Sequence, residues 1–127
     1  MEANIQEIWK DIPGFEGIYQ VSNIGKVKTL GRIAFNRYGM PKTIKERIRA
    51  TSFKKKGYEK VVLYGNDHSR KTFTIHRLVM YAFVGVSGLH IDHINGAKAD
   101  NRLSNLRYCT NQENLKFHWE KVKANKI

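Results

Sequence analysis

The chain has one cysteine, Cys109, and two prolines among its 127 residues. A single cysteine excludes an internal disulfide, and it excludes a zinc site built on several thiolates. Long apolar runs are also missing, because the longest, around Leu78 to Val86, falls far short of the ~20 residues that a helix needs to cross a bilayer. The N-terminus from Met1 to Asn4 lacks the basic and then apolar pattern of a signal peptide. We therefore expect a protein without a membrane span that acts in the cytoplasm.

Acidic residues are the second shortage, since 11 Asp and Glu face 23 Lys and Arg and leave a formal net charge of +12. A surface with this charge attracts polyanions. Residues 26–60 carry most of the excess, with twelve Lys and Arg against two Glu. We predict that this stretch contacts nucleic-acid phosphates through Lys26, Lys28, Arg32, Lys42, Arg47, Arg49, Lys54, Lys55 and Lys56. Taken alone, a basic surface also suits RNA or an acidic lipid.

The first 70 residues have the pattern of short strands separated by turns. We predict strands at residues 8–12, 19–22, 26–30, 47–53 and 58–64, forming a small antiparallel sheet. Between Gly31 and Lys45 the pattern weakens, and we expect a basic, partly mobile loop there.

From Thr72 the spacing of the apolar residues changes. Leu78, Val79, Ala82 and Phe83 lie on one face of a helix expected over residues 76–84. We then predict a strand at 89–94, a polar loop at 95–104, a strand at 105–109 and a second helix from Asn111. The fold class is therefore α+β, with a β module over residues 1–70 followed by a finger of two strands and a helix over residues 71–127.

Two further features concern the second helix. Thr110 and Glu113 have the spacing of a capping box, which fixes where the helix begins. The tail from Lys121 to Ile127 is expected to be frayed helix.

Side chains able to bind metal or transfer a proton gather in the finger. Asp92 and His93 lie on its first strand, while Asn114 and His118 share one face of its helix through their i, i+4 spacing. A divalent ion between strand and helix would meet a carboxylate oxygen, an amide oxygen and, from His118, an imidazole. Oxygen-rich donors with room for water suit Mg²⁺ or Mn²⁺ better than structural zinc. His93, next to the carboxylate, is placed to take a proton from an attacking water.

Three segments carry a resemblance to a known family. Residues 76–83 (HRLVMYAF), 90–96 (HIDHING) and 100–107 (DNRLSNLR) resemble the HNH nucleases, and more narrowly the phage and intron homing endonucleases among them. The N-terminal residues 8–27 resemble the NUMOD4 module that accompanies such nucleases. The finger would then be a ββα-metal finger, and the β module would bind DNA.

The resemblance implies a role for each residue of the finger. Asp92 and Asn114 would be metal ligands, His93 the general base, and Asn105 a structural residue that ties the finger loop, while His118 matches a third ligand found in some members. It also implies hydrolysis of a phosphodiester in double-stranded DNA that leaves a 5′ phosphate and a 3′ hydroxyl. One finger supplies one active site, so we expect nicking by a monomer or weak dimer with no obligate protein partner. The setting would be a bacterial host cell, with a phage or an intron encoding the protein.

Some alternatives stay open at this point. In a regular strand Asp92 and His93 point to opposite faces, so the strand must end, twist or bulge for both to address one phosphate. If the strand is regular, His90, otherwise a structural residue of the motif, replaces His93 as the partner of Asp92. The protein could also be an inactive DNA-binding protein or regulator that retains the fold, or a basic RNA-binding domain that leaves Asp92 and Asn114 without a purpose.

Overall fold

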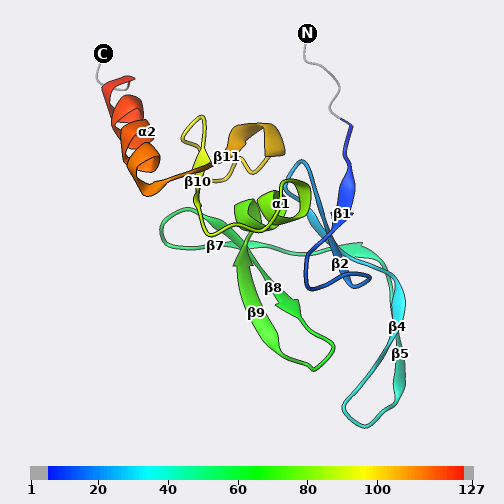
Figure 1. The fold of residues 1–127 in the computed structure, drawn as a ribbon. Coiled ribbons are helices and arrows are strands. Elements are labelled where there is room, and N and C mark those ends of the chain that lie inside the picture. The colour runs from blue at the N-terminus through cyan, green and yellow to red at the C-terminus, as the bar shows by residue number, and fades with distance from the viewer. Residues whose placement is uncertain (1–5, 125–127) are drawn as a thin grey trace.

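The computed structural model describes residues 6–124 and has the expected mixed α+β fold (Figure 1). Residues 1–5 and 125–127 lie outside the described part. Two predictions fall there, the one for the N-terminal stretch from Met1 to Asn4 and the one for the end of the tail at Ile127. The strands before the first helix are β1 (Trp9–Asp11), β2 (Tyr19–Ser22), β3 (Val27–Thr29), β4 (Arg32–Phe35), β5 (Pro41–Ile44), β6 (Arg47–Ile48), β7 (Ser52–Phe53), β8 (Glu59–Tyr64) and β9 (Arg70–Thr74). Helix α1 (Ile75–Phe83), β10 (His90–His93), the 3₁₀ turn η1 (Leu103–Asn105), β11 (Leu106–Cys109) and α2 (Asn111–Ala124) follow.

The β module is built from several small antiparallel sheets rather than one. One sheet has the strand order β1-β2-β3-β6, and another has the order β7-β8-β9. The single strand predicted at residues 47–53 is wrong, because β6 pairs with β3 while β7 pairs with β8. Two side-chain hydrogen bonds hold the segment between β6 and β7 against β8. Arg49 Nη2 donates to the Val62 carbonyl at 3.2 Å, and Thr51 Oγ1 donates to Glu59 Oε2 at 2.6 Å.

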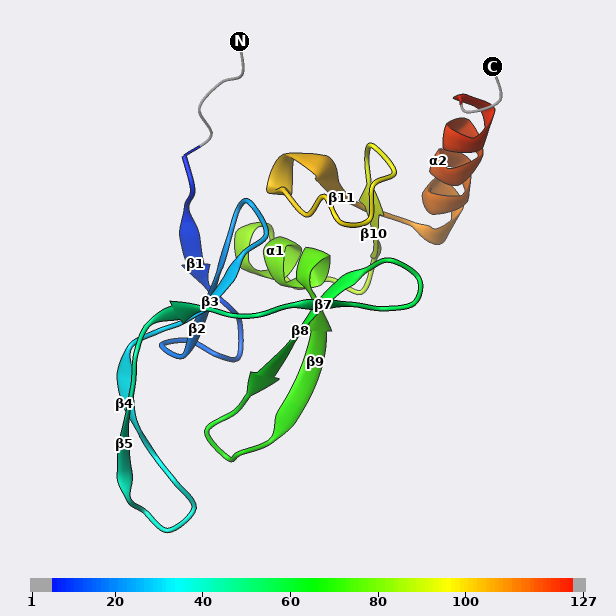
Figure 2. The same cartoon turned by 180° about the vertical axis from the view of Figure 1, so that it is seen from behind.

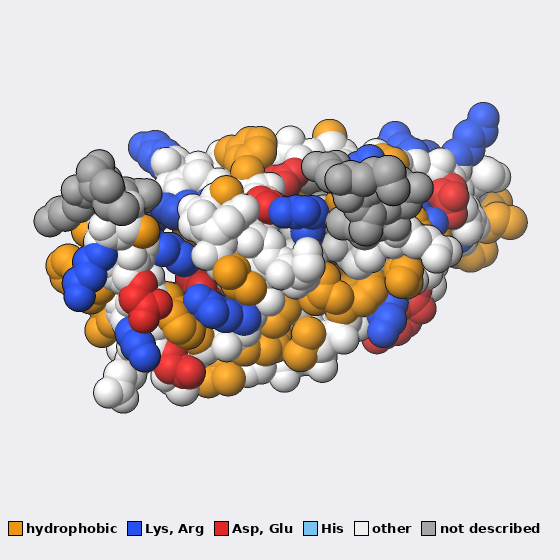
Figure 3. Space-filling view, turned by 90° about the horizontal axis from the view of Figure 1, so that it is seen from above, with side chains coloured by type: hydrophobic (Ala, Val, Ile, Leu, Met, Phe, Trp, Pro, Cys, Tyr) orange, Lys and Arg blue, Asp and Glu red, His pale blue; other side chains and the backbone are white. Residues whose placement is uncertain are grey.

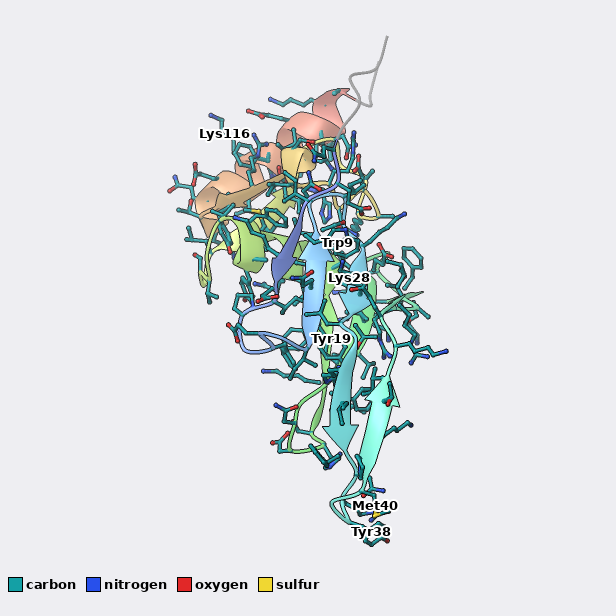
Figure 4. The ribbon with its side chains drawn as sticks, turned by 90° about the vertical axis from the view of Figure 1, so that its right-hand side faces the viewer. Trp9, Tyr19, Lys28, Tyr38, Met40 and Lys116 are labelled. Atoms are coloured by element: carbon teal, nitrogen blue, oxygen red, sulfur yellow. The ribbon has the colours of Figure 1, made fainter. Side chains whose placement is uncertain are left out.

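The stretch from Gly31 to Lys45, predicted as a loop, is a β-hairpin instead. Strands β4 and β5 pair from Arg32↔Ile44 to Phe35↔Pro41. The turn is closed by the Asn36 side chain, whose Oδ1 accepts from the Tyr38 and Met40 amides at 2.9 and 3.0 Å. The hairpin projects away from the rest of the molecule (Figures 1 and 2), and Figure 4 shows Tyr38 and Met40 at its tip.

Helix α1 lies between the β module and the finger (Figure 2) and holds the two parts together. Its residues Ile75, Leu78 and Val79 are completely buried. The core around them is formed by Ile12, Ile18, Tyr19, Val21, Val27, Val61, Leu63, Met80 and Leu106. The core therefore contains residues from both sides of residue 70, the predicted boundary between the β module and the finger. We propose that this boundary separates two sequence motifs but not two separately packed domains. No helix within residues 6–124 is both long and apolar enough to cross a membrane.

Candidate active site

The finger is an antiparallel hairpin followed by a helix. Strand β10 pairs with β11 from His90↔Cys109 to His93↔Leu106, and it ends at His93. A turn follows at once, because the Gly96 amide donates to the His93 carbonyl at 2.8 Å. Gly96 has a φ of 78°, a backbone conformation that glycine adopts readily and most other residues avoid. The strand thus ends directly after the pair Asp92 and His93, although both residues are still paired in the regular ladder, with Arg107 and Leu106.

The loop between the strands is tied by Asn105. Its side chain is buried, with Oδ1 accepting from the Asn95 amide at 3.0 Å. Its Nδ2 donates to Asn95 Oδ1 and to the Asp100 carbonyl, both at 2.9 Å. These bonds hold the two ends of the loop together, which is the structural role predicted for Asn105.

Helix α2 begins where the sequence predicts. The Thr110 amide donates to Glu113 Oε1 at 2.9 Å, and the Glu113 amide donates to Thr110 Oγ1 at 3.1 Å, so the capping box is confirmed. The backbone hydrogen bond from Thr110 is also the main reason why the pKa of Glu113 is lowered. This fixed start sets the rotation of the helix, and with it the direction in which Asn114 and His118 point.

One pocket of about 570 Å³ receives the candidate catalytic residues. It is lined by Lys54, Tyr58, Thr74, His76, Arg77, His90, Ile91, Asp92, His93, Gly96, Lys98, Asn114, Leu115, His118 and Lys121. Asp92 and His93 are 6% and 5% exposed, Asn114 is half-buried, and His118 is exposed with its ring 5.7 Å from that of Trp119. His90 lies at the exposed start of β10. The predicted ligands and both candidate bases therefore share one cavity.

Two cations neutralise the buried Asp92 carboxylate. Arg107 donates to Oδ2 through Nε at 3.0 Å and through Nη2 at 2.9 Å. Lys121 Nζ lies 2.5 Å from Oδ1 and also donates to the His93 carbonyl at 2.8 Å. Without such partners a buried carboxylate would be strongly destabilised.

Sequence reasoning missed Lys121, because it assigned that residue to a frayed tail. In the structure α2 extends to Ala124, and Lys121 is held within it by its bonds to Asp92 and His93. Its spacing from Asn114 and His118 was a usable signal, because residues i, i+4 and i+7 lie on one face of a helix.

The side chains around Asp92 include donors that could hold a divalent cation. No group of three His, Cys, Asp or Glu placed to hold a metal is found within residues 6–124. The candidate set offers one carboxylate from Asp92, one amide oxygen from Asn114 and one exposed imidazole from His118, so water would complete the coordination. Mg²⁺ and Mn²⁺ are commonly bound in this way.

His93 is held by residues of the finger and by rings from neighbouring elements. Its Nε2 lies 2.9 Å from Asn101 Oδ1, and its ring centroid is 5.1 Å from that of His76 and 6.0 Å from that of Tyr58. Burial, and then the nearby charges of His93, Arg77 and Lys54, lower the pKa of His76 to about 3. His76 Nδ1 is buried without a hydrogen-bond partner. His76 is therefore a neutral imidazole with an unused polar atom beside the candidate base.

The predicted phosphate contacts are divided between two places. Arg32, Lys42, Arg47 and Arg49 line a groove of about 970 Å³ between the β4–β5 hairpin and the turn after β8. Lys54 lines the pocket beside Asp92 instead, while Lys26, Lys55 and Lys56 are exposed.

Lys28 is less available than the other candidates. Its ammonium lies 4.4 Å from the ring centroid of Trp9 and 3.8 Å from Glu46 Oε1 (Figure 4). On the face seen from above, Lys and Arg are interspersed with Asp and Glu (Figure 3), so that face has no continuous basic patch.

Taken together, the hairpin, the helix and the pocket between them define a ββα finger of the HNH nuclease type. Residues 7–64 match the NUMOD4 motif, and residues 73–116 match the HNH endonuclease family. The chain thus combines a NUMOD4 motif with an HNH endonuclease domain, and it is a homologue of the DNA endonuclease I-HmuI. It is 39% identical to that enzyme of Bacillus phage SP01 over 109 residues, which cover 84% of this chain and 55% of the relative.

Two further similarities agree. An uncharacterized HNH endonuclease of Acanthamoeba polyphaga mimivirus is 37% identical over 115 residues, which cover 86% of this chain and 25% of the relative. A solved structure that describes DNA binding and cleavage by the HNH homing endonuclease I-HmuI superimposes on this fold with a TM-score of 0.71 at 34% identity. The match covers 91% of this chain and 59% of that one. The chain therefore spans little more than half the length of I-HmuI, and a smaller part of the mimivirus protein.

Proposed function

We propose that the chain hydrolyses phosphodiesters in double-stranded DNA with the help of a divalent metal ion. The observation that carries this proposal is the single pocket lined by Asp92, His93 and Asn114, at the place where β10 ends. A carboxylate, an amide oxygen and an imidazole in one cavity are the groups that metal-assisted hydrolysis requires.

Asp92 and Asn114 are the proposed ligands of Mg²⁺ or Mn²⁺, and His118 is the third candidate. The ion supplies electrostatic stabilisation of the charge that develops on the phosphate and on the leaving 3′ oxygen. Arg107 keeps Asp92 oriented through its two bonds to Oδ2. Lys121 must leave Oδ1, and its ammonium is then free for a phosphate oxygen.

His93 is the proposed general base. Its imidazole accepts a proton from the water that attacks phosphorus, the bond to the 3′ oxygen breaks, and the leaving oxygen takes a proton from solvent water. The products are a 5′ phosphate and a 3′ hydroxyl. His93 is buried and hydrogen-bonded, whereas His90 is exposed, so the geometry favours His93 for this role.

The β module is proposed to hold the DNA through the basic groove beside the β4–β5 hairpin. A two-stranded β-ribbon has a size that the major groove admits. Lys54 in the active-site pocket would then bind backbone phosphate next to the cleaved bond, with Lys55 and Lys56 close to it in sequence. The I-HmuI structure, whose chain binds DNA, supports this arrangement by its likeness to the present fold.

A chain with one active site is expected to cut one DNA strand at a time. We propose that a monomer nicks one strand, and that a double-strand break needs a weak dimer or two successive nicks. The setting proposed is the cytoplasm of a bacterial host, in keeping with the phage origin of I-HmuI.

The test is the conversion of supercoiled plasmid to open circles in the presence of Mg²⁺ or Mn²⁺. We expect nicking by the wild type, none in EDTA, and a large loss in Asp92→Ala and Asn114→Ala. If the wild type shifts DNA on a gel but leaves the plasmid supercoiled with either metal, the chain is a DNA-binding protein that retains the HNH fold.

A further inference from the structure

A chain of hydrogen bonds links the candidate base to the β module. His93 Nε2 lies 2.9 Å from Asn101 Oδ1, and Asn101 Nδ2 donates to Glu59 Oε1 at 3.1 Å. Glu59 is on β8, and its second oxygen accepts from Thr51 Oγ1 at 2.6 Å. Asn101 is only 3% exposed, so water has little access to replace these partners.

The chemistry of these side chains determines which atom donates and which accepts in each hydrogen bond. An ionised carboxylate can only accept hydrogen bonds, so the Asn101 amide must turn its NH₂ group toward Glu59. Its carbonyl oxygen then faces His93 and can only accept. The proton of the neutral imidazole must therefore sit on Nε2, which leaves the lone pair of Nδ1 free.

From this geometry we propose that Glu59 is a positioning residue that sets the tautomer of His93 through Asn101. The inference rests on the proposed function, in which His93 takes a proton from water. Glu59 touches neither metal nor DNA in this scheme. It makes Nδ1 the basic nitrogen by determining which way the amide of Asn101 points.

Further contacts keep Asn101 in place from the same side. A Cβ added to Gly25 would lie 2.9 Å from the Asn101 Cβ and 3.1 Å from its carbonyl oxygen, so the turn before β3 packs directly against this residue. Two residues further on, the Leu103 amide donates to the Asn23 carbonyl at 2.8 Å. The β module thus completes the surroundings of the base, in addition to any contact it makes with DNA.

Nitrogen NMR of the histidine rings tests the proposal on the whole chain, without metal or DNA. At a pH well above the ordinary imidazole pKa of ~6.5, protonated and unprotonated ring nitrogens give well-separated signals. We expect His93 to carry its proton on Nε2 in the wild type. Glu59→Gln can donate as well as accept, so it permits the reversed amide, and we expect the Nδ1–H form to appear.

Two variants serve as matched controls. Thr51→Val breaks a hydrogen bond to the same side chain but retains a carboxylate that only accepts, so His93 should stay Nε2–H. Glu46→Gln makes the same acid-to-amide change elsewhere in the β module and should also leave the tautomer unchanged. A wild-type His93 with its proton on Nδ1 overturns the proposal, and so does a Glu59→Gln protein with an unaltered Nε2–H signal.

The second measurement is the single-turnover rate of nicking. Glu59→Gln should lower the rate constant about tenfold or more, because a base in the wrong tautomer presents a proton instead of a lone pair, while its Kd for DNA should change by less than about twofold. Glu46→Gln should retain the wild-type rate. If Glu59→Gln folds and nicks as fast as the wild type, Glu59 is structural only. A chain that does not nick at all removes the proposed function but leaves the NMR result to decide the tautomer.

Discussion

At the scale of single residues, the site is organised around the buried Asp92 carboxylate. Arg107 and Lys121 approach it from different sides, and each occupies one of its oxygens. An ammonium and a divalent ion compete for the same oxygen, because each is drawn to the same negative charge. The two cations compensate the buried charge of Asp92, and we expect Lys121 to compete with a divalent ion for Oδ1.

The change Lys121→Met tests this competition. Loss of the ammonium frees Asp92 Oδ1, so we expect Mn²⁺ to bind about tenfold more tightly in the absence of DNA, as measured by titration calorimetry. Lys123→Met removes an exposed charge from the same helix and serves as the control. Equal affinities in the wild type and both variants would show that Lys121 does not compete.

His76 gives the protein a dependence of stability on pH. The unfolded chain binds this proton near the ordinary imidazole pKa of ~6.5, whereas the folded chain binds it only near pKa 3. Between these values the unfolded state binds more protons, so the free energy of unfolding falls as the pH decreases from ~6.5 toward 3.

Urea denaturation at a series of pH values measures the effect. We expect His76→Gln to flatten the slope by at most about 1.4 kcal/mol per pH unit, the value for one proton. His68→Asn, at an exposed turn with a φ of 63°, is the control because asparagine tolerates that conformation. A slope that is the same in His76→Gln and the wild type would contradict the predicted role of His76.

How much of the site could be predicted depended on the sequence distance between its members. Asp92, His93 and Asn114 were placed together from a motif whose parts lie on adjoining elements. Asn101 and Glu59 are 42 positions apart, and no local pattern relates them. Long-range side-chain contacts of this kind depend on how the modules pack, which the spacing of residues in one segment does not encode.

At the scale of the elements, the finger was predicted well and the β module only in part. Strands β10 and β11 and helix α2 have clear ends in the sequence, because a turn at Gly96 and the capping box at Thr110 define them. The β4–β5 hairpin was missed for a physical reason. Its apolar side chains Ile33 and Phe35 lie on one face of β4 and are 65% and 61% exposed, and no residue of β4 or β5 belongs to the buried core, so the hairpin lacks the buried apolar face that marks a strand.

The exposed hairpin is an element whose contribution to DNA binding can be measured separately. Arg32→Ala combined with Lys42→Ala removes two cations that line the groove, and neither belongs to the core. We expect weaker DNA binding, with the slope of log Kd against log salt reduced by about two, in an electrophoretic or fluorescence titration. Lys123→Met should keep the wild-type slope. A double variant with the same slope would place the phosphate contacts elsewhere.

At the scale of the whole molecule, the two modules form one unit. Helix α1 and the shared core join them, and Glu59 and Gly25 of the β module contact Asn101 of the finger. The NUMOD4 and HNH matches divide the sequence between them, at residues 7–64 and 73–116, but the packing crosses that division. DNA held by the basic groove would therefore be held by a module that shares its core with the finger carrying the candidate active site.

The most direct test of the central claim compares strand cleavage and DNA binding in His93→Ala. We predict that the single-turnover rate constant with saturating Mn²⁺ falls by about 10²- to 10⁴-fold, because the attacking water loses its proton acceptor, while the Kd for DNA stays within about twofold of the wild-type value. A His93→Ala protein that cleaves as fast as the wild type would contradict the assignment of this pocket as the active site.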